Sequence, residues 1–595
     1  MLRRVLFALA GVALAAFLAA DRTPTATAAE PEVGGNWLFT YSPRGGSEQV
    51  FAIVKAEVKD GKATAAVLAP APQFKTLSVK GFKQTGKAVT FTTSLGFTFE
   101  GTVSADGATV LGSFSNDQTS FRAKLAKTDK TEIDAKDATI TTPAPEPMTA
   151  ANKLTGAANL LRGQAQREKD AEKKKEILDK IPDAEKEAVE KAPGLLREVI
   201  AKHAETPFAL DAAMTLLSNG AKYKLTPKEA ADLLALVQAQ SAPFGTRFER
   251  FQTMNAVEAL VSQKGLEGAA ETAAAKLAKT EGAPAAFVSR ALTARKLALE
   301  ALGKTAEAKA VATELVAIEE KIDAEYLKTV PPFKPTAFAG RKDKDANRVA
   351  VMELFTGAQC PPCVAADVAF DALIKSYKPS ELVLIQYHLH IPGPDPLTNA
   401  DSVARAKFYG ANSTPNTFFN GKAASGGGGG MANAEKKYTD YTGVIDPLLE
   451  KTTEVKVGGR ATRAGDKIDV AVEVAGAAGD DMKLRVLVVE DTVKYVGGNQ
   501  LRFHHHVVRA MPLGADGVAI KDKAFKQTAT VDLAAVRKTL TTYLDDFAAN
   551  RPFPKPERPM DLKALKVIVL VQNDDTKEIV QAAQLEVETK TAGGQ

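Results

Sequence analysis

Only two cysteines occur in the chain, Cys360 and Cys363, and two prolines separate them. A disulfide between these residues would close a very small ring. The chain-entropy formula gives a four-residue ring roughly 2 kcal/mol of stabilisation, compared with about 4.7 kcal/mol for a 100-residue loop, and strain reduces the gain further. The pair is therefore a poor structural staple. Its spacing favours a redox couple in a chain that folds by burying apolar cores.

Length and composition indicate several ordinary globular domains. A single hydrophobic core stops growing at about 250–300 residues, so a chain of 595 residues is expected to form about three to five domains. A hydrophobic content of 45% and a charged content of 25% are typical of soluble globular protein. The net charge of +5 is not gathered into a basic patch interleaved with aromatic residues. We therefore expect no nucleic-acid partner.

The N-terminus has the features of a cleaved signal peptide over residues 1–28. Arg3 and Arg4 make a positive start, residues 5–20 are apolar, and Ala26-Thr27-Ala28 is a small-x-small cleavage site. The apolar run is shorter than the roughly 20 residues that span a bilayer. After cleavage we expect no membrane span and a periplasmic or secreted location.

The first half of the chain divides by composition into three parts. Residues 30–127 contain short β-rich runs at intervals of roughly ten residues, which predicts an all-β barrel or sandwich. Trp37 is expected to be a core or rim aromatic, and the alternative is a place in a ligand pocket. Residues 128–149 are a polar, proline-containing linker. Residues 150–327 are expected to be helical, and a turn at residues 301–308 resembles a tetratricopeptide (TPR) hairpin. This region is either a partner-binding solenoid or a spacer.

The second half changes pattern twice. Residues 328–348 form a second linker. Residues 349–452 alternate strand and helix three times, which implies an α/β sheet with both faces covered. Residues 453–591 return to strands and predict an immunoglobulin (Ig)-like sandwich, interrupted by a helical and proline-rich insert at residues 533–559.

The cysteine pair lies where a buried strand ends and a helix begins. The first turn of a helix has unpaired N–H groups and a positive dipole end, which favour a thiolate. We therefore expect an exposed Cys360 with a pKa below the free value of ~8.5. Cys363, one turn further in, is expected to be more buried and to attack a mixed disulfide formed at Cys360. Pro361 suits the first helical turn, although Pro361 and Pro362 together remove two amide donors and so restrain the fall in pKa.

Residues 349–450 resemble the thioredoxin superfamily. The segment 355–363 matches the active-site loop of that family, and its Cys-Pro-Pro-Cys sequence is similar to that of exported, cytochrome-maturation-type thioredoxins. The segment 413–421 resembles the cis-proline strand. Gln359 stands where the family usually has Trp, and Glu353 is nearest to the family's buried acidic residue. Because Glu353 is one position out of register, we expect it on the opposite face of the sheet.

The resemblance implies a role for each residue of the site. Cys360 would be the nucleophile and Cys363 the resolving thiol, with a cis Pro415 packed beside them. Thr414 would contact the substrate through its backbone, and Gln359 and Pro361 would flank it. The predicted fold class is multi-domain α+β: an N-terminal all-β barrel or sandwich, an α-helical TPR-like region, a thioredoxin-like α/β domain and a C-terminal Ig-like β-sandwich.

Histidines offer an alternative chemistry. His388 and His390, and likewise His504 and His506, are spaced so that each pair shares one face of a strand. With the two cysteines they would make a copper- or zinc-type ligand set. The other interpretations are polar residues at strand edges, or one histidine that tunes the thiols. The favoured prediction includes no metal and no other cofactor.

The function predicted from the sequence is an exported thiol–disulfide oxidoreductase. Its substrates would be protein thiols or disulfides, and it would need a redox partner in the cell envelope. The direction of electron flow stays open. Two alternatives also stay open: an envelope binding or assembly protein with a non-catalytic thioredoxin-like module, and a thiol- and histidine-based copper or zinc carrier. The tail of the chain resembles the C-terminal β-domains fused to thioredoxin-like modules in some exported bacterial proteins.

Overall fold

The structure is a computed structural model that describes residues 32–116 and 119–589. The predicted signal peptide at residues 1–28 lies outside these residues. The chain divides into two compact units. The first comprises residues up to Lys224 together with Ala231–Ala256, and the second comprises Leu225–Ala230 and Val257 onwards. Among the described residues, no helix is long and apolar enough to cross a bilayer.

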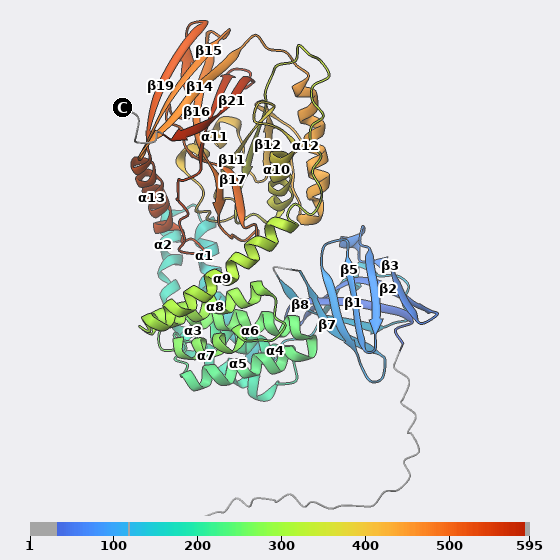
Figure 1. The fold of residues 1–595 in the computed structure, drawn as a ribbon. Coiled ribbons are helices and arrows are strands. Elements are labelled where there is room, and N and C mark those ends of the chain that lie inside the picture. The colour runs from blue at the N-terminus through green and yellow to red at the C-terminus, as the bar shows by residue number, and fades with distance from the viewer. Residues whose placement is uncertain (1–31, 117–118, 590–595) are drawn as a thin grey trace, which may run out of the picture. The chain divides into compact units, whose positions relative to one another are not determined.

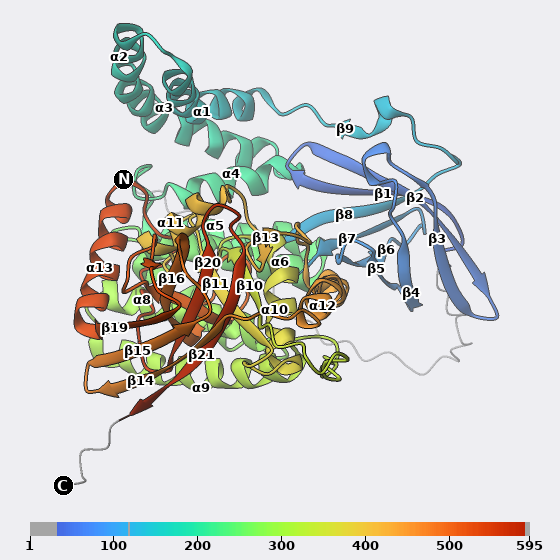
Figure 2. The same cartoon turned by 90° about the horizontal axis from the view of Figure 1, so that it is seen from above.

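The first unit begins with an antiparallel β-sheet that curls into a nearly closed barrel (Figures 1 and 2). Within residues 32–116 and 119–141, nine strands form the sheet, in the order β3-β2-β1-β8-β7-β6-β5-β4, with β9 paired to β2. The two end strands, β3 and β4, contact each other without pairing. The predicted N-terminal β domain is confirmed in this form, and β9 extends it into the predicted linker. The strands are β1 (Gly35–Arg44), β2 (Ser47–Lys59), β3 (Lys62–Pro70), β4 (Val79–Thr85), β5 (Ala88–Thr93), β6 (Thr98–Val103), β7 (Thr109–Ser115), β8 (Ser120–Lys127) and β9 (Thr139–Thr141).

Aromatic side chains fill the interior of this barrel. Trp37 is 1% exposed and its indole N–H donates to the Val33 carbonyl at 2.7 Å, so it is a core residue. Phe39 is the centre of an edge-to-face cluster, a geometry that adds to the stabilisation from burial alone. Its ring lies 5.2–5.5 Å from those of Phe51, Phe91, Phe99 and Phe114.

The predicted helical region is confirmed, but the boundary between the two compact units runs through it. The first unit ends within α6, at Ala256. Helices α7, α8 and α9 therefore belong to the second unit. The helices are α1 (Glu146–Arg167), α2 (Ala171–Asp179), α3 (Ile181–Lys202), α4 (Pro207–Ser218), α5 (Pro227–Ser241), α6 (Thr246–Val261), α7 (Glu267–Ala278), α8 (Ala285–Ala301) and α9 (Thr305–Thr329).

The second unit is organised around one mixed sheet. Its path runs β13-β12-β10-β11-β17-β16-β20-β21-β14-β15-β19, and β18 pairs with β16. β10 is parallel to β11 and antiparallel to β12. The strands are β10 (Ala350–Thr356), β11 (Leu382–His388), β12 (Asn416–Phe419), β13 (Lys422–Ala423), β14 (Lys456–Ala464), β15 (Lys467–Ala475), β16 (Gly479–Lys494), β17 (Phe503–Ala510), β18 (Val518–Ile520), β19 (Ala524–Asp532), β20 (Leu565–Asn573) and β21 (Ile579–Thr589).

The C-terminal strands continue the sheet of the cysteine-bearing segment. β11 pairs in parallel with β17 through Gln386 and Val507. The Ig-like sandwich predicted for residues 453–591 is therefore not confirmed as a separate domain, because its strand β17 pairs with β11 of the preceding segment.

Helices cover both faces of this sheet near the cysteines. α10 (Val364–Ser376) and α12 (Ala434–Leu449) pack on one face, which is lined by Met352 and Leu354 of β10, and they lie side by side in Figure 1. α11 (Ala400–Tyr409) packs on the other face, against Val351 and Phe355. The remaining helix, α13 (Leu533–Asn550), belongs to the predicted insert. Successive side chains of β10 point to opposite faces of the sheet, so only every second residue of β10 faces α10.

Candidate functional site

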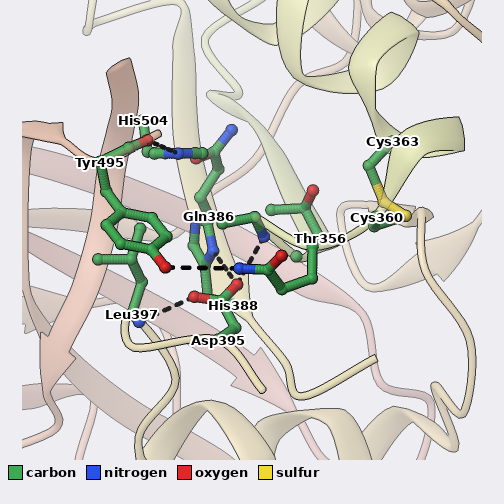
Figure 3. A network of polar contacts seen from close by, with 12 residues as sticks. Thr356, Cys360, Cys363, Gln386, His388, Asp395, Leu397, Tyr495 and His504 are labelled. Carbon is green, nitrogen blue, oxygen red and sulfur yellow. Dashed lines mark hydrogen bonds and ion pairs between the residues drawn. A yellow bond between two sulfur atoms is a disulfide. The ribbon is translucent and has the colours of Figure 1, made fainter. Parts of the chain in front are cut away.

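Cys360 and Cys363 form a disulfide at the start of α10 (Figure 3). β10 ends at Thr356, a short loop leads to Cys360, and a single 3-10 turn, η4 (Pro361–Cys363), precedes α10. Cys360 is 1% exposed and Cys363 is fully buried. The expectation that Cys360 would be exposed is therefore wrong for this disulfide form. The rings of Pro361 and Pro362 are exposed in its place.

The glycine-rich loop at residues 425–430 provides one part of the cover. The Gly429 N–H donates to the Pro362 carbonyl at 2.7 Å, and the Gly429 carbonyl accepts from the Ala365 N–H of α10 at 2.9 Å. A Cβ placed on Gly428 would lie 1.9 Å from the Pro362 oxygen and 2.7 Å from Pro415 Cγ. Only a glycine fits there.

A second cover comes from the loop between β16 and β17. The Asn499 N–H donates to the Ala358 carbonyl at 3.0 Å, and a Cβ on Gly497 would lie 2.2 Å from that same oxygen. The Gln359 side chain completes the contact: its Oε1 accepts from the Gly498 N–H at 2.9 Å, and its Nε2 donates to the Tyr495 hydroxyl at 3.4 Å. Gln359 therefore joins the cysteine loop to a segment about 140 residues further along the chain.

The Thr414–Pro415 peptide bond is cis and lies beside the disulfide. The Thr414 hydroxyl is 3.4 Å from Cys360 Sγ and donates to the Ile391 carbonyl at 3.1 Å. β12 starts at the next residue and pairs antiparallel with β10, which brings the two segments together. The structure thus brings Thr414, Pro415 and Gln359 to the cysteines, together with Pro361 of the cysteine motif itself.

A buried carboxyl that the sequence analysis missed lies on α10, in the helix that follows the disulfide. Asp367 is 2% exposed, and its two oxygens accept from the Thr356 hydroxyl at 2.9 Å and from the Gln386 amide at 3.1 Å. Burial raises the pKa of Asp367 well above its ordinary value, against the opposing effect of the Thr356 hydrogen bond. Asp367 follows Cys363 by four residues, so both lie on one face of the helix. This four-residue spacing from Cys363 could have identified Asp367 in the sequence.

Glu353 lies on the opposite face of the sheet, as its register predicts. Its carboxylate accepts from Arg405 at 2.8 and 3.1 Å and from the hydroxyls of Tyr387 and Tyr409. Both Glu353 and Arg405 are fully buried. This ion pair joins β10 to α11 and is separated from the cysteines by the sheet.

A buried histidine–carboxylate pair supports the cysteine loop. His388 Nδ1 donates to Asp395 Oδ2 at 2.8 Å, and both side chains are fully buried. Asp395 also accepts from the N–H groups of Ala358 and Leu397, at 2.6 and 2.8 Å (Figure 3). Burial alone would raise the pKa of Asp395, but His388 and these two amides outweigh it and hold the pKa below its ordinary value. Asp395 is therefore a fixed negative charge that anchors the residue two positions before Cys360.

The structure separates the histidine pairs that spacing suggested. His390 stacks on Phe547 of α13 with 3.6 Å between ring centroids, whereas His388 lies 4.9 Å from His504 of β17. His506 has a φ of 51°, which breaks the strand alternation, and its Nδ1 donates to a backbone carbonyl of β11. Within the described ranges, no group of three or more His, Cys, Asp or Glu side chains is placed to hold a metal ion.

Burial keeps two of these histidines neutral. Desolvation lowers the pKa of His504 to about 3, with His388 adding to the effect, and lowers the pKa of His390 to about 4. The His504 Nε2 donates to the Tyr495 carbonyl at 3.0 Å (Figure 3). These rings therefore serve the packing around the loop as neutral hydrogen-bonding or stacking groups.

Comparisons with known proteins supply little. No protein-family model matches the sequence, and no curated protein matches it either. Among solved structures, the chain is similar to HBP35 of Porphyromonas gingivalis, with 17% sequence identity and a TM-score of 0.29. The match covers 42% of this chain and 79% of that one.

Proposed function

We propose that the chain is a thiol–disulfide oxidoreductase whose reactive centre is the Cys360–Cys363 pair. The observation that carries the proposal is the position of the Cys360–Cys363 disulfide between β10 and α10, with the Thr414 hydroxyl 3.4 Å from Cys360 Sγ. A strand that leads into the pair, a helix that starts from it and an adjacent antiparallel strand support a thioredoxin-like module at residues 349–452.

The chemistry is thiol–disulfide exchange. A thiolate of a protein dithiol attacks Cys360 Sγ and forms a new disulfide with it, while the Cys360–Cys363 bond breaks and its electron pair goes to Cys363 Sγ. The second thiolate of the substrate then displaces Cys360, which leaves the substrate oxidised and both cysteines reduced. The same steps in reverse reduce a substrate disulfide.

Access requires the covers to open, because Cys360 is 1% exposed. The loop at residues 425–430 carries five consecutive glycines, and its hydrogen bonds near the cysteines are made by its backbone. Such a loop loses few side-chain contacts when it moves, and glycine allows wide changes in backbone angles. In this proposal a substrate displaces the loop and then lies against Thr414, Gln359 and Pro361.

The other parts of the chain enter the proposal as accessory elements. The signal-like N-terminus supports a periplasmic or secreted location with a redox partner in the envelope. The helical region would bind a partner in the manner of a TPR solenoid, and the last strands would form an Ig-like layer continuous with the redox module. Removal of residues 32–127 is expected to leave exchange with a small disulfide intact.

The test is insulin-disulfide reduction by the purified mature chain with dithiothreitol. Cys360→Ser is expected to abolish the acceleration over dithiothreitol alone, because it removes the attacking sulfur. Ser425→Ala, in the covering loop, is the control and is expected to retain it. Equal acceleration by the wild-type chain and by Cys360→Ser would reject the proposal.

The burial of both sulfurs favours a second candidate, a binding or assembly protein whose disulfide is structural. In that case the disulfide of the folded chain would resist dithiothreitol, and binding of a partner would not change after both thiols are alkylated. The rate of disulfide reduction under native conditions separates the two functions.

A further inference from the structure

We propose that Asp367 and Asp371 form a proton path along one face of α10, from Cys363 to the side chain of His505. The proposal rests on the redox function above and adds the route by which protons reach a buried thiol. Cys363, Asp367 and Asp371 follow one another at intervals of four residues. Residues at this spacing lie one above another on a helix.

The inner carboxyl is Asp367. Its hydrogen bonds come from two neutral donors, the Thr356 hydroxyl and the Gln386 amide. Burial of a side chain that is 2% exposed favours a protonated carboxyl when the disulfide is closed, and it outweighs the Thr356 hydrogen bond, which lowers the pKa of Asp367. Asp367 is thus in position to hold one proton a helical turn below the resolving sulfur.

The outer carboxyl is Asp371, whose side chain is 13% exposed. It lies 3.8 Å from Nε2 of His505, and the side chain of His505 is 23% exposed. Burial raises the pKa of Asp371 to about 6, although His505, Lys375 and His506 each lower it. Asp371 therefore changes its protonation state within the physiological range, next to a histidine that reaches solvent.

The two carboxyls are electrostatically coupled and share a neighbour. The charge of Asp371 raises the pKa of Asp367. From α9, Tyr326 faces both: burial, then Asp371 and Asp367, raise the pKa of its hydroxyl. Other charged or titratable groups around the path are Asp395, which raises the pKa of Asp367, Arg502, which lowers the pKa of Tyr326, and Tyr441 of α12, whose own pKa burial and Asp367 raise.

The proton balance of the first exchange step follows from this arrangement. An incoming dithiol thiolate forms a bond to Cys360 Sγ, and the electron pair of the broken disulfide goes to Cys363 Sγ. Asp367 gives its proton to that sulfur and becomes a carboxylate. Asp371 then returns a proton to Asp367, and solvent reprotonates Asp371 at His505. In the reverse step each proton moves outward.

The experiment measures the rate at which dithiothreitol opens the disulfide of the full chain between pH 5 and 8, divided by the fraction of dithiothreitol present as thiolate. In the wild type we expect an inflection near pH 6, the pKa of Asp371. Asp371→Asn is expected to lose the inflection and to react about tenfold more slowly at pH 6, because the proton that Asp367 gives to Cys363 can no longer be replaced along the path. Asp371→Glu should restore both.

Two further variants complete the test, one at the histidine and one as a matched control on another helix. His505→Gln is expected to move the inflection to higher pH, since His505 lowers the pKa of Asp371. Asp440→Asn on α12, an acid paired with Lys436, should change nothing.

An Asp371→Asn profile identical to that of the wild type would overturn the proton path alone. A wild-type disulfide that dithiothreitol does not open in the folded chain would instead reject the redox function, and with it the path.

Discussion

The Thr414 hydroxyl lies 3.4 Å from the sulfur of Cys360, at the start of a cis peptide bond to Pro415. The same hydroxyl donates to the Ile391 carbonyl, so it joins the cysteine loop to the segment that follows β11. The site is thus assembled from three separate parts of one sheet. Cys360 is 1% exposed, and two loops whose glycines allow close backbone approach contact the residues on either side of it.

The cover predicts that Gly428→Ala speeds reduction of the disulfide. The added Cβ would lie 1.9 Å from the Pro362 oxygen, so the loop must shift away from the cysteines. Strain of about 1–3 kcal/mol against the closed loop corresponds to roughly 5- to 150-fold faster opening by dithiothreitol. Gly426→Ala is the matched control, because its Cβ would meet nothing within 4 Å. A rate for Gly428→Ala equal to that of the control would contradict the covering role of the loop.

Asp395→Asn is expected to destabilise the second unit by about 3–5 kcal/mol. The substitution removes the buried negative charge that accepts hydrogen bonds from His388 and from two backbone amides. The pKa of Asp395 is lower in the folded chain than in the unfolded one. Its contribution is therefore present above the unfolded value of ~3.9 and is lost as the pH falls through the folded pKa. Urea unfolding at pH 7 measures the loss, and a change below about 1 kcal/mol would contradict it.

Glu353→Gln distinguishes structure from catalysis. Removing the charge leaves Arg405 buried without an anion, at a cost of about 3–5 kcal/mol. Because Glu353 lies across the sheet from the cysteines, the pH profile of disulfide opening is expected to stay unchanged. Thermal unfolding and the dithiothreitol assay together provide the measurement. A shifted profile with normal stability would show that Glu353 takes part in proton transfer at the cysteines.

Because burial lowers the pKa of His504, we expect the folded chain to lose stability in mild acid. Its pKa in the folded chain is about 3, below the ordinary value of 6.5. Between these values the unfolded chain binds the extra proton, so folding weakens by about 1.4 kcal/mol for each pH unit below 6.5. His504→Gln is expected to flatten this part of the stability curve between pH 6 and 4. An unchanged slope in urea unfolding would show that His504 charges freely in the folded chain.

Local patterns allowed the strands and helices around the cysteines to be predicted closely. The buried strand predicted before the cysteine pair is β10, and the helix predicted after it is η4 followed by α10. The structure places the Thr414 hydroxyl of the Thr-Pro dipeptide 3.4 Å from Cys360 Sγ. These features depend on period, turn residues and a short motif, all of which are contained within a few dozen residues.

What sequence reasoning missed depends on contacts between distant segments. The approach of Asn499 to Ala358 and the pairing of β11 with β17 join segments more than 100 residues apart, and no local period signals them. The exposure of Cys360 was predicted from its place at a helix start, without the covering loops. Asp367 was missed because the family resemblance places the buried acidic residue on the strand before the cysteines, whereas Asp367 lies on the helix after them.

The most direct test of the central claim is mixed-disulfide trapping with the full mature chain. Cys363→Ser, which cannot resolve the intermediate, is incubated with a protein disulfide, and the product is mapped by mass spectrometry under non-reducing conditions. We predict a covalent adduct joined through Cys360, and none for Cys360→Ser. Absence of the adduct with Cys363→Ser under conditions that keep its thiol reduced and the chain folded would contradict the account.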